Sequence, residues 1–170
     1  MNTGDIVLTT GDSWVSWCIR RGQRLRYRYA HRPYFRLTED QRRWTNYNHA
    51  ALVLNADGDL AEALADGVVR TRISKYLPGD YHVVHVNAHP HDQAQILEFA
   101  ESVLEQKWKY SWATIAGLAL VTFGSRVAFS TAGSSICSGF VCDALTRAGV
   151  IWPFPAHRMM PADVAAFYEL

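Results

Sequence analysis

A series of short apolar runs between residues 48 and 86 constrains the fold more than any other part of the sequence. Two Asp-Gly pairs, Asp57-Gly58 and Asp66-Gly67, separate the first of these runs, and such pairs between apolar stretches are typical of β-hairpins. Together with an earlier run, the expected strands are 6–9, 48–54, 59–64, 68–73 and 81–86. Short strands in succession predict a strongly curved antiparallel sheet.

A cysteine lies where an amphipathic helix is predicted to begin. After Cys137, apolar residues recur at helical spacing until Gly149 stops the run. Ser134 and Ser135 precede it, and serine hydroxyls can accept hydrogen bonds from the free amides of a first turn. The positive end of a helix favours a thiolate, and its amides can stabilise an oxyanion. The alternative is that Cys137 is a small buried core residue.

A cysteine nucleophile needs a base, and the sequence offers seven histidines. His49 is the favoured candidate because it begins an apolar strand, where a sheet can hold it against the helix N-terminus. Histidine exchanges protons near neutral pH, as such a base must. The other six lie in loops, in basic or proline-rich surroundings, or on the two faces of the strand 81–86.

The imidazole of His49 in turn needs an acceptor that fixes its tautomer. Glu62 is a carboxylate inside an otherwise apolar strand, and such a group should be paired. A two-residue turn at Asp57-Gly58 places Asp66 opposite His49 and leaves Glu62 about 13 Å away along the strand. Either a wider turn shifts the register by an even number of residues, or Asp66 orients His49.

Basic residues are concentrated in one segment of an otherwise ordinary composition. Nine of the seventeen lysines and arginines lie between Arg20 and Arg43. We interpret residues 20–44, where arginines alternate with aromatic residues, as an insertion in a single domain that spans residues 1–170. Its aromatic residues either pack on the domain or help to contact a polyanion or an anionic membrane surface. Without a nucleic-acid motif, nucleic acid is not an expected partner.

Further helices are expected at three places besides the Cys137 helix. One begins with Asp12 as its cap and ends near Arg21, one runs from Pro90 to about Lys107, and a last turn runs from Pro161 to Val164. The apolar run 112–123 is a fourth candidate, and residues 124–133 form a linker to the Cys137 helix.

Composition also gives expectations about cofactors and location. The three cysteines, at 18, 137 and 142, fit neither a disulfide framework nor a zinc site, so we expect free thiols and neither a metal nor an organic cofactor. No secretory signal is visible, and the longest apolar run is shorter than the roughly 20 residues of a spanning helix. We therefore expect a soluble chain that is cytoplasmic or exported by a non-classical route.

In the order of its motifs the chain resembles the circularly permuted NlpC-type papain-fold hydrolases, particularly the YiiX-like branch. In that group the histidine strand precedes the cysteine helix. The resemblance implies that Cys137 is the nucleophile, His49 the general base and acid, and Glu62, in preference to Asp66, the third polar residue. The matching segments are 4–7, 48–54, Glu62-Ala63 and 137–141 with Ala144-Leu145 and Gly149. Residues 20–44 and 112–133 are not obvious parts of the pattern.

We expect an α+β, permuted papain-like fold, in which a curved antiparallel sheet of about five strands packs against the Cys137 helix and one or two others. The resemblance implies a cysteine amidase or peptidase that forms a thioester with a small amide, such as a peptidoglycan stem peptide. The oxyanion donors would be the Cys137 amide with Tyr110 or Ser135. The alternatives are a lipid-acyl hydrolase or acyltransferase resembling lecithin retinol acyltransferase, and a non-catalytic binding module.

Overall fold

The structure is a computed structural model that describes residues 1–30, 36–64, 66–107, 109–110, 134–135 and 137–170. The fold is α+β, as the sequence predicts, and is built on a five-stranded antiparallel sheet in the order β4-β3-β2-β1-β5. The strands are β1 (Ile6–Thr9), β2 (His49–Val53), β3 (Asp59–Leu64), β4 (Gly67–Arg72) and β5 (Tyr81–Val84). Each overlaps a predicted strand, so the predicted sheet is confirmed.

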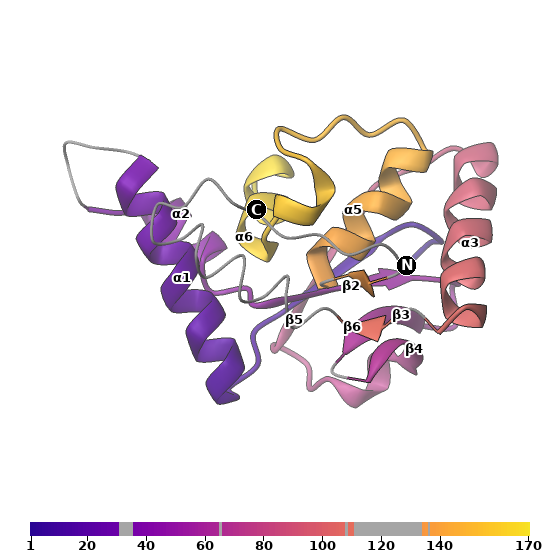
Figure 1. The fold of residues 1–170 in the computed structure, drawn as a ribbon, viewed down its shortest axis with the longest axis horizontal. Coiled ribbons are helices and arrows are strands. Elements are labelled where there is room, and N and C mark those ends of the chain that lie inside the picture. The colour runs from indigo at the N-terminus through magenta and orange to yellow at the C-terminus, as the bar shows by residue number, and fades with distance from the viewer. Residues whose placement is uncertain (31–35, 65, 108, 111–133, 136) are drawn as a thin grey trace.

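Helices cover the sheet on one side and at one end (Figure 1). Helix α5 packs on β2 and β3 and lies between α3 and α6. The helices are α1 (Trp14–Ala30), α2 (Glu39–Trp44), α3 (Pro90–Glu105), α5 (Cys137–Arg147) and α6 (Pro161–Phe167), with short 3-10 turns η1 (Ile73–Lys75) and η2 (Ala156–Arg158). The predicted helices at 90–107 and after Cys137 are confirmed with small changes at their ends.

The sheet has an apolar cluster on each face because successive side chains point to opposite sides. The larger cluster holds Ala50 and Leu52 of β2 against α3 and α5, where Phe99 and Phe140 stack with ring centroids 6.2 Å apart. The smaller cluster contains Ala51 and the other inward residues of that face, Val7, Val53 and Leu60, next to η1 and β5. Strand β2 is therefore buried on both sides.

The Leu54 amide donates to the Asp59 carbonyl at 2.8 Å, so the loop between β2 and β3 contains four residues, and the wider of the two alternatives is the one present. Val53 pairs with Leu60, and residues 55–58 form the connection. The Asn55 side chain accepts a hydrogen bond from the Asp59 amide at 3.1 Å, which closes the wider loop. Gly58 ends it with a φ of +86°, a conformation that favours glycine. The register consequently shifts by two residues from the one that a two-residue turn gives.

Helix α1 differs from its prediction at both ends. Ser13, and not Asp12, occupies the capping position, since its Oγ accepts a hydrogen bond from the Ser16 amide at 3.1 Å. The helix continues past Arg21 to Ala30. Arginines and aromatic residues replace a regular apolar stripe here, so periodicity underestimates a helix that tertiary contacts hold in place.

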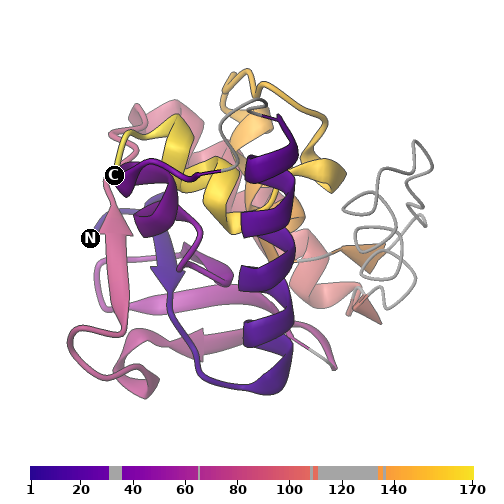
Figure 2. The same cartoon turned by 90° about the vertical axis from the view of Figure 1, so that its left-hand side faces the viewer.

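Those contacts attach the described part of the insertion to the domain. Buried Gln23 donates to the Tyr47 carbonyl and accepts from the Ala162 amide, both at 2.8 Å. Arg26 pairs with Asp163 at 2.8 Å. Figure 2 shows α1 lying across the front of the molecule in that view, with its inner side against the domain.

The remaining differences concern the C-terminal half. Helix α6 runs to Phe167, beyond the predicted end at Val164. The predicted helix at 112–123 and linker at 124–133 lie outside the described residues. Within the part of the chain that is described, no helix combines the length and apolar character needed to cross a bilayer.

Candidate active site

The corrected register brings Glu62 to His49. Extending the pairing of Val53 with Leu60 by two residues places Glu62 opposite Ala51, which lies two residues from His49 on the same face of β2. Such diagonal neighbours are within reach of long side chains. Nε2 of His49 and Oε2 of Glu62 are 2.7 Å apart. The contact that a wider turn predicts is therefore present.

The carboxylate of Glu62 is fully buried and surrounded by hydrogen-bond donors. Besides His49, the Tyr76 hydroxyl donates to Oε2 at 2.7 Å, and the Lys75 ammonium and Thr71 hydroxyl donate to Oε1. Burial alone would raise the pKa of Glu62. The hydrogen bond and charge of His49, together with hydrogen bonds from Lys75 and Thr71, instead lower that pKa to about 2. Glu62 is thus a fixed anion at any physiological pH.

Cys137 is the first residue of α5 and is 5% exposed. Burial acts to raise the pKa of its thiol. The charge and hydrogen bond of His49, joined by hydrogen bonds from the backbone amides of Ala50 and Ser138, act more strongly and lower that pKa. Nε2 of His49 is bonded to Glu62, so a hydrogen bond between His49 and the thiol uses the other ring nitrogen, Nδ1.

His49 therefore lies between two negatively charged groups. Burial would lower the pKa of His49, but Cys137 and Glu62 raise it to about 9. The lowered pKa of the Cys137 thiol and the raised pKa of His49 both favour a thiolate beside an imidazolium. The His49 side chain is 17% exposed, so the pair is shielded without being sealed from solvent. A thiolate in this setting can attack an electrophilic carbon.

The other predicted site residues are placed differently. Asp66 is exposed in the turn between β3 and β4, and Glu62 occupies the position next to His49. Tyr110 and Ser135 are register partners in a separate parallel pair of strands, β6 (Lys109–Tyr110) and β7 (Ser134–Ser135). Ser134 and Ser135 thus belong to a strand that precedes the helix, and the oxyanion roles of Tyr110 and Ser135 stay predictions.

Sequence reasoning missed the three donors that surround Glu62. Thr71 lies two residues after Val69, the register partner of Glu62, so strand alternation places it on the same face. Lys75 and Tyr76 carry no comparable signal. They reach Glu62 only because η1 turns the chain back after β4.

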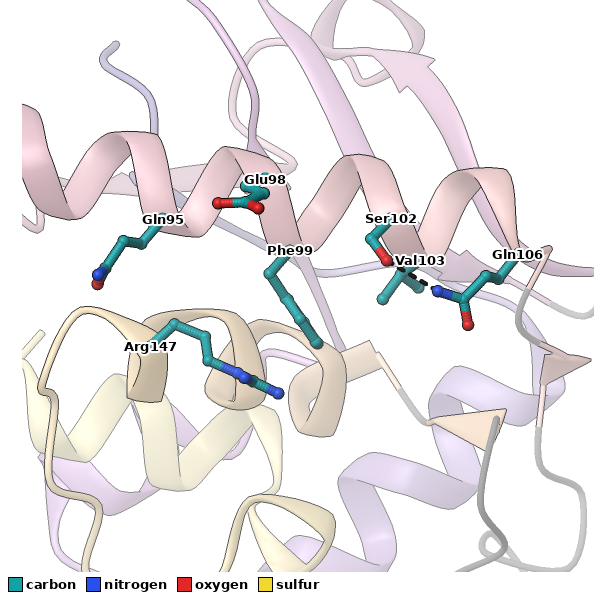
Figure 3. A pocket seen from close by; sticks show the side chains of 7 residues that line it. All are labelled: Gln95, Glu98, Phe99, Ser102, Val103, Gln106 and Arg147. Carbon is teal, nitrogen blue, oxygen red and sulfur yellow. Dashed lines mark hydrogen bonds between the residues drawn. The ribbon is translucent and has the colours of Figure 1, made fainter.

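A hollow of about 500 Å³ lies apart from this cluster (Figure 3). It lies between α3 and the C-terminal end of α5, whereas Cys137 is at the opposite end of α5. Its lining consists of Gln95, Glu98, Phe99, Ser102, Val103, Gln106 and Arg147. Across the described residues as a whole, no group of three or more His, Cys, Asp or Glu side chains is arranged to hold a metal ion.

No protein-family model matches the sequence, and a search of curated proteins gave no match. The resemblance to the permuted papain-fold hydrolases therefore depends on the residues quoted above, and any functional conclusion depends on the site itself.

Proposed function

We propose that this protein is a cysteine hydrolase that cleaves a small amide through a thioester intermediate. The observation that carries the proposal is the placement of His49, whose Nε2 is 2.7 Å from the buried carboxylate of Glu62 and whose charge and hydrogen bonding lower the pKa of the Cys137 thiol. A nucleophile, a base and a group that orients the base recur in this arrangement on unrelated folds.

We further propose that the fold is a permuted papain-like fold. The order of the elements supports this, because the strand that carries His49 precedes the helix that Cys137 begins. Helix α5 also packs on β2, which brings the helix N-terminus to the start of the histidine strand.

In the first step, the Cys137 thiolate attacks the carbonyl carbon of the amide and forms a C–S bond. The backbone amide of Cys137, at the positive end of α5, is the candidate donor to the resulting oxyanion. As the C–N bond breaks, the His49 imidazolium gives its proton to the departing amine. The product is a thioester on Cys137 and a neutral imidazole.

In the second step, the neutral His49 imidazole removes a proton from a water molecule, which attacks the thioester carbonyl carbon. The C–S bond breaks, the carboxylic acid leaves, and Cys137 departs as a thiolate beside the regenerated imidazolium. Throughout, Glu62 accepts a hydrogen bond from Nε2–H of His49, which leaves Nδ1 for the sulfur and stabilises the charged imidazole.

Trapping the acyl-enzyme tests the proposal. The protein is mixed with a panel of peptide amides that includes peptidoglycan stem peptides, quenched in acid, and examined by intact-mass spectrometry. We expect an adduct of the acyl mass on Cys137 that hydroxylamine removes. The Cys137→Ala variant should form none, and the Cys142→Ala variant should form it normally. If activated esters also give no adduct on Cys137, the protein is a binding module and the hydrolase proposal is wrong.

A lipid-acyl hydrolase or acyltransferase is the second candidate, and it would use the same thiol chemistry on an ester. The observation that favours it is the strong exposure of Trp14 and Trp17, 76% and 58%, on the helix that follows β1. The same trapping experiment with a short-chain phospholipid separates the candidates. An acyl chain on Cys137 from the phospholipid, with no adduct from the amide panel, would favour ester cleavage, and the reverse result would favour the amidase.

A further inference from the structure

Helix α1 exposes two large aromatic side chains on its outer face. Trp14 is 76% exposed and Trp17 is 58% exposed. They are three residues apart and are therefore neighbours on one side of the helix. Adjacent exposed tryptophans form an apolar patch, and apolar patches that stay exposed mark interaction sites more often than scattered single residues do.

The same side of the helix continues as a line of arginines. Arg21, Arg24 and Arg28 follow Trp14 and Trp17 at spacings of three and four residues, which keeps all five in one stripe. Arg21 and Arg28 are exposed, and neither forms an ion pair with any residue that the structure describes. Arg24 is half-buried and donates to Asn46 at 2.7 Å. We call these five residues the α1 stripe.

The opposite side of α1 is fixed to the domain. Gln23 and Arg26 make the contacts to Tyr47, Ala162 and Asp163 described above. The helix contains five arginines and no acidic residue. Arg26 pairs with Asp163 and Arg20 lies 3.6 Å from Asp12, so within the described part of the chain the exposed, unpaired positive charge of the outer side comes from Arg21 and Arg28. The α1 stripe thus consists of two tryptophans and three arginines on the side of α1 away from the contacts of Gln23 and Arg26. Figure 2 shows where α1 lies on the domain.

We propose that the α1 stripe docks the protein on an anionic membrane surface. Indole rings favour the headgroup level of a bilayer, and arginines bind the phosphates of anionic lipids. The separation of tryptophans at one end from arginines along the rest suits a helix that lies on such a surface. A single-stranded nucleic acid, the competing polyanion, is bound by aromatic residues that stack on successive bases along a charged groove.

The position of the stripe also gives it a link to the site. The Asn48 side chain accepts from the Gly11 amide at 3.2 Å and donates to the Gly11 carbonyl at 3.0 Å. Gly11 lies just before α1, and Asn48 immediately precedes His49. Docking would hold the start of β2, which carries His49, close to the bilayer. The docking proposal does not depend on whether Cys137 is a nucleophile.

Vesicle flotation of the full chain tests the docking. Vesicles of phosphatidylcholine alone are compared with vesicles that contain about 30% phosphatidylglycerol, at about 50 mM and about 500 mM salt. We expect binding to the anionic vesicles at low salt only. Trp14→Ala with Trp17→Ala should weaken it about tenfold or more. Arg21→Gln with Arg28→Gln should weaken it by about fivefold for each arginine.

Two exposed residues away from α1 supply matched controls. Ile151→Ala removes an apolar side chain that is 87% exposed, and Arg72→Gln removes an arginine that is 70% exposed. Both should bind as the wild type does, and circular dichroism should show that every variant is folded. The proposal is overturned if anionic vesicles are not bound at low salt, if the controls weaken binding as much as the stripe variants, or if single-stranded RNA competes binding away and is itself bound more tightly.

Discussion

Helix α5 carries two buried cysteines, five residues apart, whose thiol pKa values are shifted in opposite directions. The pKa of Cys137 is lowered and that of Cys142 is raised. Burial raises both, so burial does not distinguish them. Cys137 receives the charge of His49 and two backbone amides, whereas Cys142 is next to the carboxylates of Asp143 and Asp163.

The difference shows that a helix supplies only part of what makes a thiol reactive. The helix N-terminus is available to Cys137 by its position, but the group that acts most strongly on its pKa, after burial, comes from β2. The sheet register sets that contact, since it holds His49 between Cys137 and Glu62. The lowered pKa of the Cys137 thiol therefore depends on tertiary structure.

The largest expected loss of activity comes from removing the Cys137 thiol, and removing the Cys142 thiol is the comparison. Cys137→Ala should abolish hydrolysis, a loss of about 10⁴-fold or more for a nucleophile. Cys142→Ala should leave the rate within about twofold and lower the free energy of unfolding by about 1 to 2 kcal/mol, because it empties part of the core. Rate assays and urea unfolding measure the two effects. Equal losses of activity in the two folded variants would remove the distinction between the thiols.

Glu62→Gln should lower the rate by about 100-fold or more, because an amide does not hold the His49 tautomer or its charge as a carboxylate does. It also changes acid stability. The pKa of Glu62 in the fold, about 2, is below its ordinary value of 4.5, so the carboxylate stabilises the fold above pH 4.5 and this contribution is lost as pH falls toward 2. Unfolding at several pH values should show that loss in the wild type and not in Glu62→Gln.

The pH profile of acylation gives a third test. The pKa of His49 is raised to about 9, so the imidazolium that protonates the leaving amine is present below that pH. We expect the acylation rate to fall about tenfold for each pH unit above 9. A single-turnover assay on an amide measures it. A profile that falls near pH 6.5 instead would mean that Cys137 and Glu62 do not stabilise the charged ring.

The smallest effect is expected at the donors around Glu62. Tyr76→Phe removes one hydrogen bond to Oε2 and should lower the free energy of unfolding by about 1 kcal/mol, with a rate loss of less than about tenfold. Tyr81→Phe is the matched control, because the two rings are 6.4 Å apart and no described residue bonds to the Tyr81 hydroxyl. If the two variants behave alike, the Tyr76 hydroxyl has no role in holding Glu62.

The sheet could be predicted from the sequence because each strand is a short apolar run bounded by turn residues. The length of the β2–β3 turn is less certain from the sequence, since it depends on the Asn55 side chain, which closes a four-residue loop. That one detail decides whether Glu62 or Asp66 lies near His49. Asparagine is a residue that stabilises turns through its side chain, so a signal was present in the sequence.

At the candidate site, Cys137 and His49 could be selected as candidates because the beginnings of helices and strands can be predicted from sequence patterns. Lys75 and Tyr76 could not, since they follow a strand in an irregular turn and meet Glu62 only after the chain folds back. The length of α1 could not be predicted from the sequence either. Its stability depends on contacts of Gln23 and Arg26 with a segment that is more than a hundred residues away in sequence.

The most direct test of the thiolate and imidazolium pair is the pH dependence of iodoacetamide labelling, read by mass spectrometry, in the wild type and in His49→Ala. At pH 6 we expect Cys137 to be labelled in preference to Cys18 and Cys142, and the rate to fall about 100-fold in His49→Ala as the thiol pKa returns toward its ordinary value. Labelling of Cys137 only above about pH 8.5, at the same rate in both proteins, would contradict the pairing.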